Sequence, residues 1–543
     1  MGSMSPIRGC RRTIMMSSVL LFFVGGMSAT DGAPPTWTFV TGGRIVGSPV
    51  VTETGRVYAV AEDRYLYAVE HGVARWRYDL RVRPIGPIRV SPDGTVVVRT
   101  RADSLVAVNP GGGTVWAYRH RTEIASFEHG GDGHVLIGDS AGVITALSAT
   151  GRVVFRVAVG DSPVTTILRG SGYNLFAATR DGRLAAITDG GARVFRRLFE
   201  ARIEAMASTA DRVIIALSDG RLIAVDTFGR EVWTIGVPEA ARRLGVAGAH
   251  IALISDNAVW FFDNSGITVG DDRFDGLGDT VIAGDGVFVA AGNAVYSVRA
   301  SQPRAPVARF SSGVGAIGAG GGRVAIGTDD WVLSSFGNAH ATSRPGIGAR
   351  VPYWRTSYDY LFLKDQISAG TDQAVRATRE MISRVDRADL AGSYHTIREL
   401  LIEVATPRTP RTGRVIPPDV RSAAVRALGR LGDAVVRDFL ARAVAAETDP
   451  LVMVAIFDAF TDTGIVSPEP ILEIAARYLS RARGAELSGE IARAGVDLVI
   501  AAHRYAGYVP DVGVELLRRA MEAPFPREIR EYALTAARQI DGR

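Results

Sequence analysis

Cysteine and lysine are almost absent from this chain. Its 543 residues include a single cysteine, Cys10, and a single lysine, Lys364. Cys10 precedes the apolar N-terminal stretch, so it is not placed like a lipidated cysteine, which follows such a stretch. If the N-terminus is removed on export, the remaining chain can form neither a disulfide nor a thiolate metal site. We attribute the preference for arginine over lysine to a GC-rich coding bias and not to arginine chemistry.

The chain also lacks a large excess of charge of either sign. Its formal net charge is +5, and it falls to about +2 without Arg8, Arg11 and Arg12, which lie in the N-terminal segment. So small a charge does not supply the basic surface of a nucleic-acid-binding protein. With 47% hydrophobic residues, the chain is globular and too long for one domain.

Residues 1–29 have the pattern of a secretory signal peptide. Three arginines precede an apolar run from Thr13 to Gly26, and Met27-Ser28-Ala29 offers a cleavage site. The alternative is an uncleaved N-terminal anchor, although a run of about 14 residues is short of the ~20 that span a bilayer. We predict a bacterial protein exported to the periplasm or cell envelope. Its membrane association is expected to be peripheral or through an uncleaved N-terminus.

A repeated pattern of short strands fills the first part of the chain. The first unit, Arg56 to Leu80, alternates β-branched and aromatic runs with polar turns, and it recurs through Val213 to Trp233. An aromatic residue closes each unit, at Trp37, Trp76, Trp116, Phe155, Phe195 and Trp233. These residues recur about every 39 positions, which is the period of four-stranded propeller blades. We expect the closing tryptophans to be core residues between blades.

The count of units predicts an eight-bladed β-propeller over residues 30–338. Two weaker units end at Phe274 and Phe310, and a partial unit, Ala316 to Phe336, lacks its closing strand. Trp37, in contrast, lies in a closing strand that has no other strands of a blade before it. The strand at residues 36–40 is therefore predicted to complete the last blade, which closes the ring and leaves no open sheet edge.

The repeat resembles a known family. Asp219-Gly220-Arg221-Leu222-Ile223-Ala224-Val225-Asp226, followed by Gly229 and Trp233, is similar to the quinoprotein-type (PQQ-like) propeller repeat. The stretch from Leu105 to Asn109, with Trp116, matches it as well. The resemblance covers about residues 37–336 and implies the propeller fold, which serves many functions.

The pattern changes after a Gly- and Pro-rich linker at residues 339–352. Residues 353–543 are predicted to be an all-α domain, in which "VRSAAVRALGRLGD" (420–433) resembles the HEAT repeat of helical solenoids. Residues 356–406 are helical but fit the repeat poorly, and we expect them to cap the domain or dock on the propeller. The tract at 406–418 reads as an exposed loop. Helices are expected at 420–431, 434–445, from 450, 468–479, 487–504, 511–521 and 527–540.

Two polar clusters could carry metal chemistry. The first is "EHGGDGH", in which His129 and His134 stand with Glu128 and Asp132. Zinc would suit these ligands, but three glycines favour a polar turn between strands. The second is the acidic run at Asp271, Asp272, Asp275 and Asp279, which suggests calcium. Because Arg273 occupies the third position of that run, a solvated loop is the preferred interpretation.

Catalysis is not predicted. Quinoprotein dehydrogenases of this propeller type hold a quinone beside a disulfide and a calcium ion, and the exported chain would lack the cysteines. The glycine-rich stretch Gly315 to Arg323 lies between strands, so it reads as a blade turn and not a dinucleotide site. The motifs of nucleophile elbows, zinc proteases and phosphate loops are missing. We therefore predict a non-enzyme with no catalytic, cofactor-binding or metal residues and no cofactor.

With catalysis not predicted, the preferred functional class is an interaction scaffold. The propeller resembles that of the BamB family, which belongs to the outer-membrane β-barrel assembly machinery of Gram-negative bacteria. This chain departs from that family by lacking a lipobox cysteine and by adding helices. We predict an exported protein–protein interaction scaffold whose partners are envelope or outer-membrane proteins. The alternative is a module that binds a small molecule or glycan in the propeller funnel.

Overall fold

The computed structural model describes most of the two predicted regions. It describes residues 34–337 and 358–540, apart from short gaps at 92, 131–132, 171–173, 370, 391–392, 409–414, 466, 482–487 and 523–524. The predicted signal, the linker at 339–352 and part of the 406–418 tract lie outside the described residues. Within the described residues, no helix has the length and apolar character needed to cross a bilayer.

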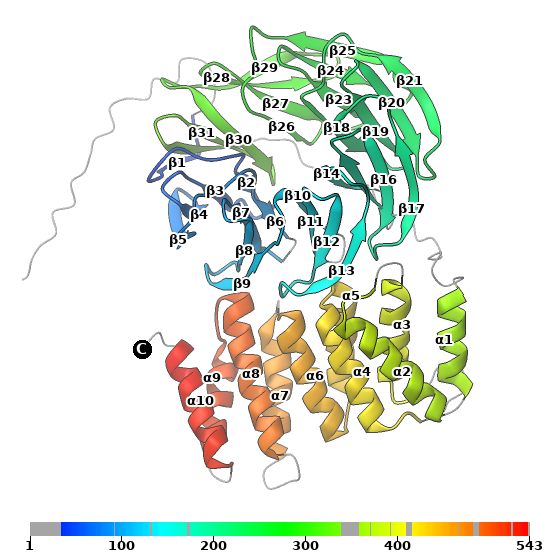
Figure 1. The fold of residues 1–543 in the computed structure, drawn as a ribbon. Coiled ribbons are helices and arrows are strands. Elements are labelled where there is room, and N and C mark those ends of the chain that lie inside the picture. The colour runs from blue at the N-terminus through cyan, green and yellow to red at the C-terminus, as the bar shows by residue number, and fades with distance from the viewer. Residues whose placement is uncertain are drawn as a thin grey trace, which may run out of the picture.

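The described strands form eight antiparallel four-stranded sheets arranged as a ring, as predicted (Figure 1). Blade 1 contains β2 (Val50–Val51), β3 (Val57–Val60), β4 (Tyr65–Glu70) and β5 (Val73–Asp79). Blade 2 contains β6 (Arg89–Val90), β7 (Val96–Thr100), β8 (Ser104–Val108) and β9 (Thr114–Arg119). Blade 3 contains β10 (Ile124–His129), β11 (Val135–Asp139), β12 (Val143–Leu147) and β13 (Val153–Ala158). Blade 4 contains β14 (Val164–Arg169), β15 (Asn174–Thr179), β16 (Arg183–Thr188) and β17 (Arg193–Leu198).

The second half of the ring repeats this order. Blade 5 contains β18 (Ile203–Ser208), β19 (Arg212–Leu217), β20 (Arg221–Asp226) and β21 (Glu231–Gly236). Blade 6 contains β22 (Arg243–Ala247), β23 (His250–Ile254), β24 (Ala258–Phe262) and β25 (Thr268–Arg273). Blade 7 contains β26 (Thr280–Ala283), β27 (Gly286–Ala291), β28 (Ala294–Arg299) and β29 (Gln302–Arg309). Blade 8 contains β30 (Val314–Gly320), β31 (Arg323–Thr328), β32 (Val332–Gly337) and β1 (Trp37–Val40).

The N-terminal strand closes the ring as the sequence predicts. Strand β1 pairs antiparallel with β32, with Trp37 opposite Ser335 and Val40 opposite Val332. The last three-stranded unit therefore gains its outer strand from the other end of the repeat region. Because the N-terminal strand belongs to the sheet of the last blade, the two ends of the repeat region are joined at this seam and the outer edge of β32 is paired.

The closing aromatic residues join each blade to the next. The ring of Trp116 packs against Gly151, which lies in the turn between the third and fourth strands of the next blade. A Cβ atom on Gly151 would come within 2.7 Å of Trp116 Cγ, and φ is +79° there. The indole Nε1 of Trp116 also donates to the Ala149 carbonyl at 2.9 Å. The same contact recurs between Trp76 and Gly112. The glycine of the repeat therefore leaves space for its neighbour's aromatic ring.

The glycine-rich stretch of blade 8 lies mostly in a strand, so the predicted blade turn is confirmed only for Gly321 and Gly322. Strand β30 contains Gly318, at which a Cβ would lie 1.9 Å from the Pro49 carbonyl oxygen of blade 1. Gly321 and Gly322 form the turn to β31 with φ values of +52° and +70°. These glycines therefore permit the close approach of blades 8 and 1 and a left-handed turn.

Ten helices occur in the described part of the C-terminal region. They are α1 (Tyr358–Ala369), α2 (Thr371–Asp386), α3 (Tyr394–Ala405), α4 (Pro418–Leu431), α5 (Ala434–Ala446), α6 (Pro450–Thr463), α7 (Pro468–Arg481), α8 (Ser488–Ala506), α9 (Asp511–Ala520) and α10 (Arg527–Ile540). Asp433 and Asp449 cap α5 and α6 by accepting hydrogen bonds from backbone N–H groups. Small residues bring α4 and α6 together, because a Cβ on Gly429 would lie 2.7 Å from Ala459 Cα.

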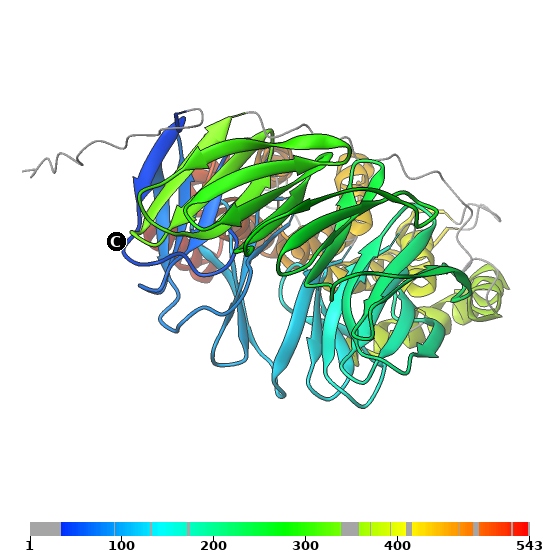
Figure 2. The same cartoon turned by 90° about the horizontal axis from the view of Figure 1, so that it is seen from above.

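The helices form a row that stands against the ring. Figure 1 shows the row beneath the blades that contain β9 and β13, and Figure 2 shows the ring from above with the row partly behind it. The hydrophobic core of the helices is continuous with the junction between blades 3 and 4, where it includes Phe155 and Ile187. Tyr394 and Leu431 belong to the same cluster. The two regions therefore share a core at this junction.

Candidate functional site

The helices meet the propeller at one of its two faces. In each blade, the turns between strands 1 and 2 and between strands 3 and 4 lie at one end of the sheet, and the other connections lie at the opposite end. The polar contacts between the two regions, in the described residues, involve Asn109, His134, Arg152 and Asp189 of blades 2 to 4. All four residues lie in 1–2 or 3–4 turns. This helix-bound face is therefore partly covered, and the opposite face, called here the open face, is left for other contacts.

A buried polar network holds the centre of this contact. Asp433 is 0% exposed, and it accepts hydrogen bonds from Tyr394 Oη at 2.5 Å and Arg398 Nη1 at 2.6 Å. His134 Nε2 of blade 3 lies 3.3 Å from Tyr394 Oη and 3.5 Å from the Leu431 carbonyl oxygen. Burial disfavours the charged form of Asp433, yet Arg398 and Tyr394 hold the pKa of its carboxyl group below the usual value. The network therefore fixes the start of α5 and the start of α3 against blade 3.

Further contacts extend the interface on both sides of the network. His395 of α3 hydrogen bonds to Asp189 of blade 4, and both residues are buried. Arg152 of blade 3 forms an ion pair with Asp462 at 3.0 Å. At the other end, a Cβ on Gly111 of blade 2 would lie 2.7 Å from Gly507 Cα, just beyond α8. The helix ends from α3 to α8 thus follow the turns of three successive blades. The docking role expected for residues 356–406 is performed by α3.

The open face carries exposed pairs of opposite charge. Arg44 and Asp329 lie 3.1 Å apart at the seam between blades 8 and 1. Other exposed pairs at this face are Arg83–Glu62, Arg202–Glu204 and Arg221–Asp219, and Arg243 pairs there with the partly buried Asp279. Exposed ion pairs contribute little to stability, about 0–1 kcal/mol each. They give the face a mixed pattern of charge that a partner of complementary pattern can recognise.

Trp331 stands out at the seam on the open face. Its side chain is 50% exposed and its φ is +70°. Blades 3, 4 and 5 place glycine at the corresponding turn position, such as Gly182 and Gly220 with φ of +87° and +83°, and blades 1 and 2 place Arg64 and Asp103 there with φ of +72° and +50°. The Trp331 carbonyl accepts bonds from Thr41 N and Thr41 Oγ1, both at 2.9 Å. A bulky residue in this conformation costs roughly 1–2 kcal/mol, and its exposed ring gains no core packing in return.

Sequence reasoning missed Trp331, although a signal for it was present. In blades 4 and 5, Asp-Gly stands directly before the third strand, as in Asp219-Gly220, whereas blade 8 has Asp330-Trp331 there. Tryptophan disfavours the left-handed backbone conformation that this turn position requires. Mismatches of this kind between a residue and its backbone conformation concentrate at functional sites. The fold itself could not require a tryptophan here, because glycine would meet the backbone demand better.

The residues of the "EHGGDGH" motif have separate partners in the structure. Glu128 and His129 are the last two residues of β10, so the preferred polar turn is wrong for them, and it is confined to the residues between β10 and β11. Asp132 lies outside the described residues. Glu128 pairs with Arg89 of blade 2 at 2.9 Å. Burial lowers the pKa of His129, and His134 contacts Tyr394 of the helical region. His134 therefore belongs to the contact between the two regions and not to a solvated turn.

The aspartates of the acidic run at 271–279 also lie in different elements and have different partners. Asp271 and Asp272 lie in β25, so the expected solvated loop is wrong for these two residues. They belong to the outer strand of blade 6, where Asp272 pairs with Arg304 at 3.3 Å. Asp279 lies beyond that strand, and it accepts a hydrogen bond from Ile317 N at 2.8 Å. Within the described residues, no three His, Cys, Asp or Glu side chains gather as metal ligands would.

The comparison with protein families concerns the propeller. The family model of the outer membrane protein assembly factor BamB matches residues 25–120, 69–171 and 140–344. These segments together span residues 25–344, which is more than half of the 543 residues. No curated protein matches the chain.

Several solved structures are similar to the propeller part. BamB from Moraxella catarrhalis is 18% identical, with a TM-score of 0.46, over 56% of this chain and 98% of that one. The computationally designed protein Ika8 is 15% identical, with a TM-score of 0.48, over 56% of this chain and 100% of its own. Sqt1 from Saccharomyces cerevisiae is 11% identical, with a TM-score of 0.48, over 57% of this chain and 100% of its own. Because the family model extends over all eight blades, this chain belongs to the family of the outer membrane protein assembly factor BamB, and it carries a helical region after the propeller.

Proposed function

We propose that this protein is a non-catalytic, exported scaffold that brings proteins together during outer-membrane protein assembly in the bacterial cell envelope. Membership of the BamB family supports this role, because propellers of that family are commonly non-catalytic. The predicted signal at residues 1–29 supports export. The helices occupy one face of blades 2 to 4, so the partner is expected at the open face.

The observation that carries the proposal is the exposed, strained Trp331. Tryptophan is enriched among the residues that dominate the binding energy of protein interfaces. Trp331 gives the open face such an anchor where glycine would suit the backbone better. Strain of this kind persists in proteins when the residue serves a function.

The charges around Trp331 suit the rim of an interface. Arg44 pairs with Asp329, and the Arg44 carbonyl accepts a hydrogen bond from Glu62 N at 2.8 Å. Glu62 in turn pairs with Arg83 at 3.1 Å. Trp331 is thus flanked by a connected band of polar groups from blades 8 and 1. A central aromatic residue with a polar rim is the usual anatomy of a protein–protein interface.

The test is capture of partners by variants of the tagged protein from its own cell envelope, after mild crosslinking. Trp331→Gly is expected to lose most of the captured outer-membrane assembly proteins. The same variant should be as stable as the wild type or more stable by about 1 kcal/mol, because glycine relieves the left-handed strain. Thermal unfolding measures that second effect.

Phe228→Ala is the matched control. Phe228 is 70% exposed and lies in a 3–4 turn of blade 5, on the face opposite Trp331. The control should capture the same partners as the wild type. Equal losses in both variants would contradict the role of Trp331. A wild-type protein recovered alone, with a bound small molecule or glycan, would contradict the scaffold itself.

A further inference from the structure

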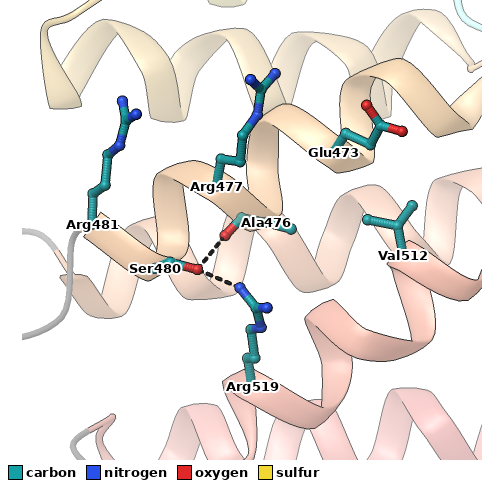
Figure 3. Close-up of a pocket in the computed structure, with 7 residues that line it drawn as sticks. All are labelled: Glu473, Ala476, Arg477, Ser480, Arg481, Val512 and Arg519. Atoms are coloured by element: carbon teal, nitrogen blue, oxygen red, sulfur yellow. Dashed lines mark hydrogen bonds between the residues drawn. The ribbon is translucent and has the colours of Figure 1, made fainter.

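A groove on the helical region lies well apart from the open face of the propeller. It has a volume of about 500 Å³ and lies between α7 and α9. Figure 3 shows Glu473, Arg477 and Arg481 projecting from one side of α7, and Arg519 reaching from α9 toward Ser480. The groove therefore presents charged side chains from two neighbouring helices.

Its arginines differ in how they are paired. Arg519 Nε bonds to Glu515 at 2.7 Å, and Arg519 Nη1 bonds to Ser480 Oγ. Arg477 and Arg481 are both exposed, and no carboxylate of the described residues lies within ion-pair distance of either. Two cationic groups are thus left for an external anion at one end of the groove.

Away from the two arginines, the lining of the groove is first apolar and then, at the far end, acidic. Ala476 and Val512 provide apolar surface, and Glu473 stands one helical turn before Arg477. The charge of the groove is therefore polarised along α7, from Glu473 at one end to Arg477 and Arg481 at the other. A ligand with carboxylates at the arginine end matches this pattern, whereas a uniformly acidic ligand would meet Glu473.

The spacing of the two arginines indicates the form of the ligand. Residues four apart on a helix are separated by about 6 Å along its axis. In an extended peptide, alternate side chains lie on one side at intervals of about 6.8 Å. Two acidic residues separated by one position would therefore reach Arg477 and Arg481 together. Arginine and carboxylate form strong, charge-assisted hydrogen bonds.

We propose that the α7–α9 groove binds an extended acidic segment of a partner protein, with carboxylates at alternate positions on Arg477 and Arg481. Stacked helical pairs commonly bind extended segments on such surfaces. The apolar floor would receive the side chain beside the acidic pair. This site does not depend on the proposed role of the open face, and it would remain if that role were wrong.

The test measures binding of labelled peptides to the purified full chain by fluorescence anisotropy. The probe is a fluorescein-labelled decapeptide with glutamates at two alternate positions, and the matched probe carries lysines there. The glutamate peptide is expected to bind, more weakly as salt is raised, and the lysine peptide is not. The double variant R477Q/R481Q should bind the glutamate peptide on the order of tenfold more weakly or worse, because two charge-assisted contacts are lost.

The double variant R376Q/R379Q is the matched control. Arg376 and Arg379 are exposed arginines on α2, and glutamine is a good helix former at all four positions. This control should bind the peptide as the wild type does. Equal binding by R477Q/R481Q, or equal binding of the lysine peptide, would overturn the proposal. So would full displacement of the peptide by inorganic phosphate or by phosphatidylglycerol vesicles at matched charge, since the site would then recognise anions or lipid headgroups.

Discussion

The propeller and the helical region organise their cores in opposite ways. In the described residues, seven of the eight junctions between blades have a separate hydrophobic cluster. The helices instead form one continuous cluster, and this cluster includes the eighth junction, between blades 3 and 4. A change in a blade should therefore act locally, whereas a change at the helix ends should be felt in both regions.

This difference also affects how each part of the molecule is held in place. The ring is held by repeated local contacts, so its open face is a rigid surface on which individual turns can vary. Trp331 is such a variation. The helical region depends on contacts between residues far apart in the sequence, such as Tyr394 with His134, and it covers the turns to which it is bound.

The largest effect is expected where the two regions meet. Asp433→Ala should destabilise the protein by about 3–5 kcal/mol, because Arg398 would be left buried without its carboxylate partner. Urea unfolding measures the loss. Hydrogen exchange should also become faster in the turns of blades 3 and 4, since these turns share the helical core.

Asp449→Ala is the control for that variant. Asp449 also caps a helix, by accepting from Leu451 N and Val452 N, but it lies outside the buried network. Its loss should cost about 1 kcal/mol, as for an ordinary helix cap. Similar losses for the two variants would show that the network adds nothing beyond capping.

A smaller and local effect is expected within the ring. Gly151→Ala should cost about 2–4 kcal/mol, because it combines left-handed strain with a clash against Trp116. Gly220→Ala has similar strain, with φ of +83°, but the added Cβ would lie 3.6 Å from its nearest neighbour, the Val237 carbonyl oxygen. It should cost only about 1–2 kcal/mol. Thermal unfolding of both variants separates the cost of the left-handed strain from the cost of the clash with Trp116. Equal losses of stability would contradict the role of the aromatic contact in joining the blades.

The smallest effect depends on pH. Burial raises the pKa of Asp462, although Arg152 of blade 3 lowers it in part. The folded state therefore holds this proton more tightly than the unfolded chain does, so the contribution of Asp462 to stability rises as pH falls from 7 toward its raised pKa. Asp433, whose pKa is lowered, acts with the opposite sign and at lower pH.

Urea unfolding between pH 7 and pH 4 would test this sign. The wild type should gain stability relative to Asp462→Asn as pH falls, by about 1 kcal/mol or less, because solvent still reaches the partly exposed side chain. A difference that stays constant, or one that changes in the opposite direction, would show that the folded state does not favour protonated Asp462.

The propeller could be predicted because its sequence repeats. The contact between the propeller and the helices contains no repeat, so less of it could be predicted. The eight blades and the closing role of residues 36–40 followed from the spacing of Trp37 and the later aromatic residues. The helix predicted at 420–431 from its apolar spacing is observed at Pro418–Leu431. The role of His134 did not, because its partner Tyr394 is distant in sequence and only the fold brings them together. No site residue was predicted, and Trp331 conflicts with the repeat in a way that points to a surface role.

The central claim is that one face of the ring holds the helices and the opposite face binds the partner. Site-specific photocrosslinking in the native envelope tests it directly, with a photoreactive phenylalanine analogue placed at position 331 or at position 228. We expect position 331 to crosslink to an outer-membrane assembly protein and position 228 not to do so. Crosslinking of such a protein from position 228 alone would contradict it.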